Sequence, residues 1–182
     1  MKKLNEKTLS SKTVYKGGMI SLQVDTVELP NGNIATRDIV NHQGSVGAIA
    51  FTEDDRILMV RQFRKPLDKV ILEIPAGKLE KGEDPTECAL RELEEETGYK
   101  AGKVEHVSSF YTSPGYTNEL KHLYKATDLM MGTLNPDEDE FVELEKLTYD
   151  DCLKAMELGD ICDVKTIFAI QLWGADIKSR IL

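Results

Sequence analysis

The chain has 182 residues, of which 41% are hydrophobic and 30% charged, and its formal net charge is −9. The length suits one domain with a small appendage, and the composition is that of an ordinary globular protein. An acidic chain is a poor general binder of nucleic acid, and no apolar run approaches the roughly 18 residues that cross a bilayer. Three cysteines without metal-type spacing argue against a disulfide framework. We therefore expect a soluble, cytoplasmic protein without nucleic-acid or membrane partners.

The negative charge is concentrated in two short segments. Residues 80–96 hold eight acidic and two basic side chains, a net charge of −6. Residues 137–145 hold six acidic side chains and no basic one, again −6. The rest of the chain is therefore slightly basic, at +3. The acidity belongs to two local features and not to the whole surface.

Strand patterns dominate the first two thirds of the chain. Residues 14–42 read as strands, with a turn signal at residues 30–33. Further extended segments are expected at residues 45–52, 56–63, 69–77, 103–112, 119–127 and 141–144. Helical spacing then appears in residues 148–160 and 163–179.

A helix over residues 85–97 is predicted by signals at both of its ends. Asp84 suits the N-cap, Pro85 suits the first turn, and Glu87 stands at the third position, which together resemble a capping box. Gly98 suits the residue just past the helix end. With strands before and after it, this helix indicates an α+β or layered α/β fold with a mixed sheet.

The chain divides by pattern near residue 44. We expect residues 1–44 to form a small N-terminal β element, and residues 45–182 to form the main domain. No internal repeat or flexible linker separates the rest of the chain. The main domain therefore carries the predicted helix and both acidic segments.

Three carboxylates cluster on one side of the predicted helix. A helical wheel places Glu92, Glu95 and Glu96 on an arc that adjoins the apolar face. Like charges at this spacing repel, and they stand in the last turns, where the helix dipole favours cations. A solvated acidic face is the simple interpretation. The alternative is that hard divalent cations, which prefer oxygen ligands, neutralise this arc.

The residues around this helix resemble the Nudix box, G-x5-E-x7-R-E-U-x-E-E-x-G-U, where U is a bulky apolar residue. All seven fixed positions match: Gly77, Glu83, Arg91, Glu92, Glu95, Glu96 and Gly98. Leu93 satisfies the first apolar position, and Tyr99 stands where the family usually has an aliphatic residue. The resemblance implies the α/β/α layered Nudix fold, with a mixed sheet between helices.

The resemblance also implies a metal-dependent pyrophosphohydrolase. Glu92, Glu95, Glu96 and the carbonyl of Ala76 become metal ligands for two or three Mg²⁺ ions, which Mn²⁺ can replace. Arg91 is expected to hold a metal-binding glutamate in place. Such ions would neutralise the pyrophosphate oxygens and lower the pKa of a bound water.

Flanking motifs are similar to the ADP-ribose pyrophosphatase branch of this family. They include the Ser-Pro-Gly around Pro114 and residues 62–64, 72–77 and 139–143. The branch implies a nucleotide-sugar substrate and a homodimer that exchanges its N-terminal β elements. Within that resemblance we expect Arg64 and Arg37 to contact substrate, with a surface ion pair as the alternative for each. Glu73 and Glu119 are candidates for ribose contact or for support of other site residues.

The second acidic segment resembles the mobile loop that supplies the general base in this branch. Glu140 is the preferred base and Glu138 the second choice, because an alignment of so many acids can slip by two residues. The expected reaction is hydrolysis of ADP-ribose to AMP and ribose 5-phosphate. Alternatives are another nucleotide pyrophosphate (NADH, a dinucleoside polyphosphate or an oxidised nucleoside triphosphate) and a non-catalytic nucleotide-sensing module.

Overall fold

The structure, a computed structural model, describes residues 4–136 and 140–181. It separates into two compact units. The first consists of Met1–Gly44 with Phe110–Lys121, and the second consists of Ser45–Ser109 with His122–Leu182. One boundary thus falls at residue 44, where the sequence pattern changes. The segment Phe110–Lys121 was expected in the main domain, and the structure instead groups it with the N-terminal strands.

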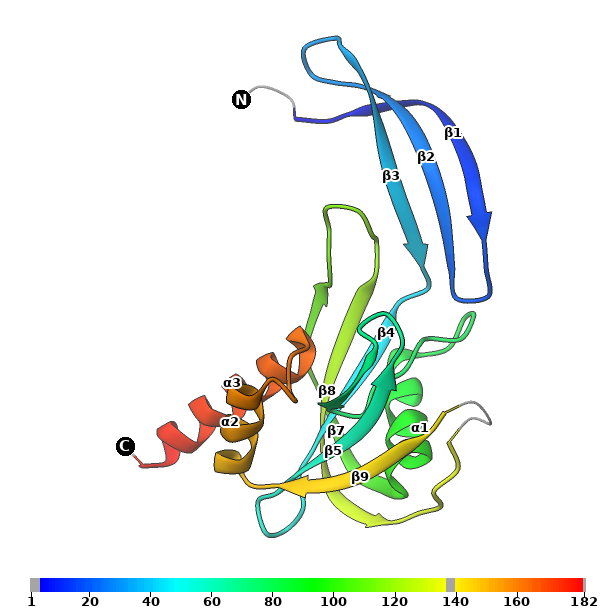
Figure 1. The fold of residues 1–182 in the computed structure, drawn as a ribbon. Helices are drawn as coiled ribbons and strands as arrows, with labels where there is room; N and C mark the ends of the chain where they lie inside the picture. The colour runs from blue at the N-terminus through cyan, green and yellow to red at the C-terminus, as the bar shows by residue number, and fades with distance from the viewer. Residues whose placement is uncertain (1–3, 137–139, 182) are drawn as a thin grey trace. The chain divides into compact units, whose positions relative to one another are not determined.

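The first unit is built on a three-stranded antiparallel sheet in the order β1 (Lys7–Lys16), β2 (Ile20–Glu28), β3 (Ile34–His42) (Figure 1). The expected turn joins β2 to β3, and the backbone N–H of Gly32 donates to the carbonyl of Leu29 at 2.8 Å. The segment Phe110–Lys121 joins this unit through β3, because the Val40 N–H donates to the Tyr116 carbonyl at 2.7 Å.

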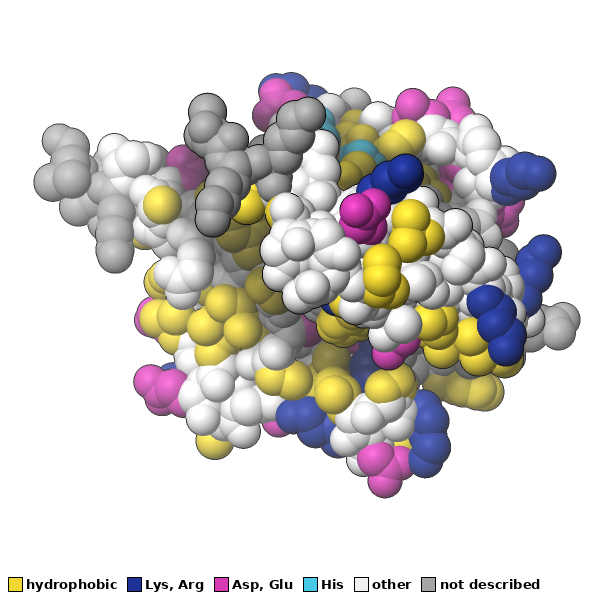
Figure 2. All heavy atoms as spheres, turned by 90° about the horizontal axis from the view of Figure 1, so that it is seen from above, with side chains coloured by type: hydrophobic (Ala, Val, Ile, Leu, Met, Phe, Trp, Pro, Cys, Tyr) yellow, Lys and Arg dark blue, Asp and Glu magenta, His cyan; other side chains and the backbone are white. Residues whose placement is uncertain are grey.

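The sheet of the first unit leaves apolar side chains exposed. All ten residues of β1 are exposed, and the exposed apolar side chains of the sheet are Leu9, Val14, Tyr15 and Ile34. Figure 2 views the molecule from above and shows apolar side chains at the surface beside basic ones. A thin sheet with exposed apolar residues buries little surface by itself, and such exposed patches are typical of interaction sites.

The second unit contains two further three-stranded sheets and three helices. One sheet has the order β4 (Ser45–Ala50), β8 (Leu120–Met131), β7 (Tyr99–Tyr111), and the other has the order β6 (Lys69–Glu73), β5 (Ile57–Arg64), β9 (Val142–Leu147). The helices are α1 (Pro85–Thr97), α2 (Tyr149–Leu158) and α3 (Val164–Ile181). Figure 1 shows α1 on one side of these strands and α2 and α3 on the other. The expected α+β class and layered arrangement are confirmed.

Helix α1 begins and ends where the sequence predicts. The Asp84 side chain accepts hydrogen bonds from the backbone N–H groups of Thr86 (2.8 Å) and Glu87 (3.4 Å), which satisfies two of the free donors at the helix start. Gly98 adopts the left-handed conformation, with φ 71°, and its N–H donates to Glu94. The reciprocal capping box belongs to α2, where Thr148 and Asp151 exchange hydrogen bonds.

Helix α1 is fixed by its apolar face. Leu93 is fully buried and packs with Ala48 of β4, Leu58 of β5 and Ala126 of β8. This contact holds the last two turns of α1 against the strands. None of the helices within the described residues combines the length and the apolar character that crossing a bilayer requires.

Candidate active site

Two carboxylates of α1 are buried against the loop that enters the predicted box. Glu96 is 1% exposed and Glu92 is 7% exposed. Glu96 Oε2 accepts a hydrogen bond from the Ala76 N–H at 3.0 Å. A Cβ atom on Gly77 would lie 1.9 Å from the Glu92 carboxyl carbon, so a glycine is required for Glu92 to lie where it does. The box therefore brings the loop at 76–77 into direct contact with the acids of the helix.

Burial makes ionisation of these two carboxylates unfavourable. Loss of solvent raises the pKa of Glu92 to about 7, with Arg91 opposing the shift. It raises the pKa of Glu96 to about 8, although the Ala76 N–H favours the charged form. The charge of Glu140 raises both pKa values further. Two adjacent acids with such pKa values favour a cation, which would stabilise both in their charged form.

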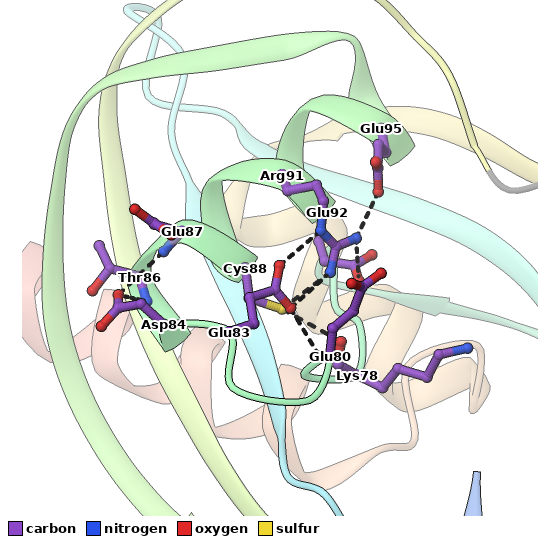
Figure 3. Close-up of polar contacts among 10 residues, drawn as sticks. All are labelled: Lys78, Glu80, Glu83, Asp84, Thr86, Glu87, Cys88, Arg91, Glu92 and Glu95. Carbon is purple, nitrogen blue, oxygen red and sulfur yellow. Dashed lines mark hydrogen bonds and ion pairs between the residues drawn. The ribbon is translucent and has the colours of Figure 1, made fainter. Parts of the chain in front are cut away.

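Arg91 joins the helix to the loop before it. Its Nε and Nη2 donate to the two carboxylate oxygens of Glu83 at 2.9 and 3.2 Å, a bidentate pair. Its Nη1 lies 2.9 Å from Glu92 Oε1 and 2.8 Å from Glu95 Oε2 (Figure 3). The bonds to Arg91 lower the pKa of Glu83 to about 2. These contacts suit the expected role of Arg91, which is to orient glutamates rather than to touch substrate.

The backbone of the loop supplies a further oxygen. The carbonyls of Pro75 and Gly77 accept hydrogen bonds from Ala48 and Val46 of β4, at 2.8 and 2.9 Å. In such an alternating ladder the residue between them turns both its N–H and its carbonyl to the opposite side. The Ala76 N–H is on the side of Glu96. We therefore place the Ala76 carbonyl on that side as well.

These donors fit a hard divalent cation. Carboxylate and carbonyl oxygens are the ligands that Mg²⁺ and Mn²⁺ prefer. Within the described residues no three His, Cys, Asp or Glu side chains stand close enough together to hold one ion. Arg91 explains this spacing, because it is the positive partner of both Glu92 and Glu95. The chemical type of these oxygen donors suits a divalent cation, and Glu96 and Glu92 are the most buried of them.

Arg64, at the end of β5, interacts electrostatically with one of the same acids, Glu96. Its Nε donates to Glu73 Oε1. Burial alone would lower the pKa of Arg64, but Glu73, Glu96 and Glu140 outweigh it and the pKa is raised. Glu73 is 2% exposed and also accepts a hydrogen bond from Lys165 Nζ. Its position suits support of Arg64, and a ribose contact by Glu73 remains a prediction.

Glu140 lies just before β9 and is close enough to raise the pKa of both Glu92 and Glu96. It also lines an open groove of about 520 Å³ with Phe63, Pro136 and Phe141. The preferred base is thus close enough to the buried acids to affect their pKa values, and its role as base remains a prediction. Glu138, the second choice, lies outside the described residues.

Two further candidates lie in the first unit. Arg37 donates from Nε to Glu6 Oε2 at 2.9 Å and from Nη2 to the other oxygen of the same carboxylate. This is the surface ion pair that the sequence left as the alternative. Glu119 accepts a hydrogen bond from the Thr112 hydroxyl at 2.9 Å. A substrate contact by either residue remains a prediction.

Sequence reasoning missed Lys165 and the glycine contact. Lys165, in the first turn of α3, is 7% exposed and bonded to Glu73. Nothing in its local pattern marks it, because its partner lies 92 positions earlier in the chain. The contact of Gly77 with Glu92 likewise becomes visible only when loop and helix are brought together. Its signal in the sequence was the match of Gly77 to the first fixed glycine of the Nudix box.

Comparison with known proteins places the chain in a family. Residues 41–162 match the family model of the NUDIX domain, and residues 6–40 match that of the nucleoside diphosphate sugar hydrolase N-terminal domain. The chain belongs to the Nudix family and is a hydrolase of that class. Proteins of this family generally need a divalent cation such as Mg²⁺.

Two curated relatives are similar over almost their full length. The chain is 50% identical to an ADP-ribose pyrophosphatase of Bacillus subtilis over 94% of both chains. It is 51% identical to a methanol dehydrogenase activator of Bacillus methanolicus over 93% of both chains. Among solved structures, the crystal structure of an ADP compounds hydrolase superposes with a TM-score of 0.85 over 97% of this chain and 96% of the other. At 20% identity, that superposition supports the fold alone.

Proposed function

We propose that the protein hydrolyses the pyrophosphate of ADP-ribose, and that of other ADP-sugars, to AMP and the sugar phosphate. The observation that carries this proposal is the pair of buried carboxylates, Glu92 and Glu96, against the loop at Ala76 and Gly77. The similarity to an ADP-ribose pyrophosphatase along almost the whole chain supports the choice of substrate. For ADP-ribose itself, water adds to one phosphorus, the bridging P–O bond breaks, and the products are AMP and ribose 5-phosphate.

The side chains divide the work by their chemistry. Glu92, Glu95, Glu96 and the Ala76 carbonyl would hold two or three Mg²⁺ ions, or Mn²⁺ in their place. When bound, these ions would neutralise the phosphate oxygens and activate water. Arg64 suits phosphate contact, because a guanidinium pairs with phosphate oxygens in a planar, bidentate manner.

Glu140 is proposed as the general base. A carboxylate can take the proton of an attacking water if it is ionised and within hydrogen-bond reach. The position of Glu140 near Glu92 and Glu96 supports this choice. Glu138 is the second candidate for the same role.

The assembly proposed is a homodimer that exchanges its N-terminal β elements. Its support is the exposed sheet of the first unit, in which β1 is exposed along its whole length and carries apolar side chains. Arg37 would then reach a substrate in the partner's site. Sedimentation equilibrium tests the dimer, and a monomer at micromolar concentration would contradict it. We also propose a cytoplasmic location, because all three cysteines are free thiols.

A substrate panel tests the proposed activity. The purified protein is incubated with Mg²⁺ or Mn²⁺ and with ADP-ribose, other ADP-sugars, NADH, a dinucleoside polyphosphate or an oxidised nucleoside triphosphate. Products are identified by chromatography. The proposal predicts AMP and ribose 5-phosphate from ADP-ribose with the highest kcat/KM of the panel. Failure to turn over any ADP-sugar would overturn it, and turnover of another compound alone would move the activity to that class.

The base is tested with three matched variants. Glu140→Gln should lower kcat by about 10²- to 10⁴-fold, the usual contribution of general base catalysis, and leave Mn²⁺ affinity largely unchanged. Glu138→Gln tests the second candidate in the same way. Glu157→Gln, an exposed acid of α2, is the control and should retain activity. If Glu140→Gln is as active as the parent protein, the base is another residue.

A second candidate function follows from the methanol dehydrogenase activator, which is as similar to this chain as the ADP-ribose pyrophosphatase is. The 51% identity to a methanol dehydrogenase activator makes activation of such a dehydrogenase a testable alternative. The protein is added to a purified methanol dehydrogenase and the rate of methanol oxidation is followed. Activation that persists in Glu96→Gln would indicate a non-catalytic partner role. If Glu96→Gln loses both hydrolysis and activation, activation of the dehydrogenase depends on the hydrolytic activity.

A further inference from the structure

The first turn of α3 meets the end of β6 and the residue after it through two buried hydrogen bonds. Lys165 Nζ donates to Glu73 Oε2 and, at 2.9 Å, to Asp163 Oδ1. The Ile74 N–H donates to the Thr166 hydroxyl at 3.1 Å. Thr166 is fully buried, and Lys165 and Glu73 are 7% and 2% exposed. All of these residues belong to the second unit.

Glu73 is shared between two cations. One of its oxygens accepts from Arg64 Nε and the other from Lys165 Nζ. Without Lys165, both oxygens would be available to Arg64, and a carboxylate binds a guanidinium most strongly through two parallel hydrogen bonds. Arg64 would then be drawn toward Glu73 and away from the acids near α1. Lys165 therefore limits how Glu73 can hold Arg64.

This network is not what stability alone would select. Burying charges costs solvation energy, and replacing a buried ion pair with apolar side chains of similar size is often neutral or stabilising. Lys165 nevertheless pairs with Glu73 and Asp163, and both Lys165 and Glu73 are buried. Asp163 also caps α3, because its Oδ1 accepts from the Thr166 N–H at 3.1 Å. The cap fixes the turn from which Lys165 extends.

The same turn of α3 fixes the loop that carries the candidate ligand. Thr166 holds the N–H of Ile74. Two residues later, the Ala76 N–H binds the Glu96 carboxylate. The start of α3 is thus linked to both halves of the site, through Glu73 to Arg64 and through Ile74 to the loop at Ala76.

We propose that Lys165 is a positioning residue, which acts through Glu73 to hold Arg64 in place for a phosphate of the substrate. The proposal rests on the proposed function, because it takes Arg64 as the phosphate contact. Lys165 itself touches no substrate. Its removal should therefore weaken substrate binding through Arg64 while the metal-binding acids keep their positions.

Kinetics of Lys165 variants test this role. Lys165→Met keeps the length of the side chain without its charge and should raise KM for ADP-ribose about tenfold, with a smaller change in kcat. Lys165→Arg keeps a cation at this position, so its KM should stay close to that of the parent protein. Lys154→Met, an exposed lysine of α2, is the matched control. If Lys165→Met does not fold, Lys165→Gln replaces it; its neutral amide can still donate to Glu73, so KM should rise by less than tenfold, and a parental KM would overturn the proposal.

A double-mutant cycle separates positioning from a general structural effect. If Lys165 acts through Arg64, then Lys165→Met should cause little further loss of kcat/KM in an Arg64→Ala background. Full, additive loss in that background would overturn the proposal, as would a parental KM in Lys165→Met alone.

An NMR measurement keeps this test independent of turnover. The ¹H–¹⁵N signal of the Arg64 Nε–H group is assigned and followed in the parent protein, in Lys165→Met and in Lys154→Met. The proposal predicts a shifted Arg64 signal in Lys165→Met only, and an unchanged signal would contradict it. A parent protein without ADP-ribose turnover would overturn the proposed function, and the NMR result would still decide the role of Lys165.

Discussion

Glu83 and the pair Glu92 and Glu96 belong to one motif but lie in opposite environments. Glu83 has a bidentate partner in Arg91, and its pKa falls to about 2. Burial raises the pKa of Glu92 and Glu96 to about 7 and 8, and Glu96 accepts a hydrogen bond from the backbone N–H of Ala76. An acid that the protein neutralises by itself contributes to structure. Glu92 also contacts Arg91, but burial outweighs that contact, so Glu92 and Glu96 are the acids that an external cation would stabilise.

The largest effect is expected at the most buried acid. Glu96→Gln should lower kcat/KM for ADP-ribose by about a thousandfold or more, because an electrostatic contribution to the transition state is lost together with a cation ligand. Kinetics across a Mg²⁺ titration measure this loss. Glu87→Gln, an exposed acid of the first turn, should stay close to the parent. If Glu96→Gln and Glu87→Gln are equally active, the buried acid of α1 is no more important for activity than the exposed one, which would contradict the account.

Gly77→Ala disturbs the same acids without changing any charge. The new Cβ would lie 1.9 Å from the Glu92 carboxyl carbon, so the flexible Glu92 side chain must move while the backbone can stay. Activity should fall by about a hundredfold, in line with the cost of a misplaced catalytic group, and the melting temperature should change little. Gly18→Ala, where nothing lies within 4 Å, is the control. A stable variant with full activity would show that the position of Glu92 is unimportant.

Arg91→Met should affect stability more than the preceding changes do. It leaves Glu83 without its bidentate partner and removes the cation between Glu92 and Glu95. We expect the free energy of unfolding to fall by about 2 kcal/mol, because the bidentate pair that is lost is only partly buried. Urea denaturation measures the change. Arg56→Met, which breaks an exposed pair with Asp54, should cost only about 0.5 kcal/mol, and equal losses would contradict the account.

The smallest effect is the pH dependence of stability without metal. Because the folded pKa values of Glu92 and Glu96 exceed the unfolded value near 4.5, the folded state binds more protons, and stability should fall as pH rises from about 5 to about 8. Glu83 has the opposite sign, since its contribution is lost only as pH falls from about 4.5 toward about 2. Thermal melts in EDTA should show a melting temperature that falls steadily as the pH rises from 5 to 8.

The control for this pH dependence is Glu96→Gln, which cannot ionise at that position. Its stability should vary less between pH 5 and 8 than that of the parent, and added Mg²⁺ should stabilise the parent more than the variant. A parent protein without metal that becomes more stable toward pH 8 would contradict the pKa values assigned to the buried acids.

The sequence predicts local features well because their causes are local. The limits of α1 follow from Asp84 and Gly98, and the burial of Glu92 and Glu96 follows from helical spacing beside Leu93. Such patterns act over one or two turns, so neighbouring residues are enough to identify them.

Contacts between distant segments are not visible in the same way. The sequence left Glu73 as a candidate for ribose contact or for support of other site residues, and only the structure shows Arg64 and Lys165 on its two oxygens. The assignment of Phe110–Lys121 to the first unit likewise depends on hydrogen bonds to β3. Such pairings join residues tens of positions apart, and no local pattern of charge or hydrophobicity specifies them.

The central claim is that Glu92 and Glu96 bind a divalent cation. Calorimetric titration of Mn²⁺ at pH 6.5, in buffers of different ionisation enthalpy, measures both affinity and the protons released. With pKa values of about 7 and 8, the two carboxyls hold protons that a metal must displace, so the parent should release between about one and two protons per site. Glu96→Gln should bind more weakly and release fewer protons. Equal affinity in both proteins, with no proton release from the parent, would contradict the account.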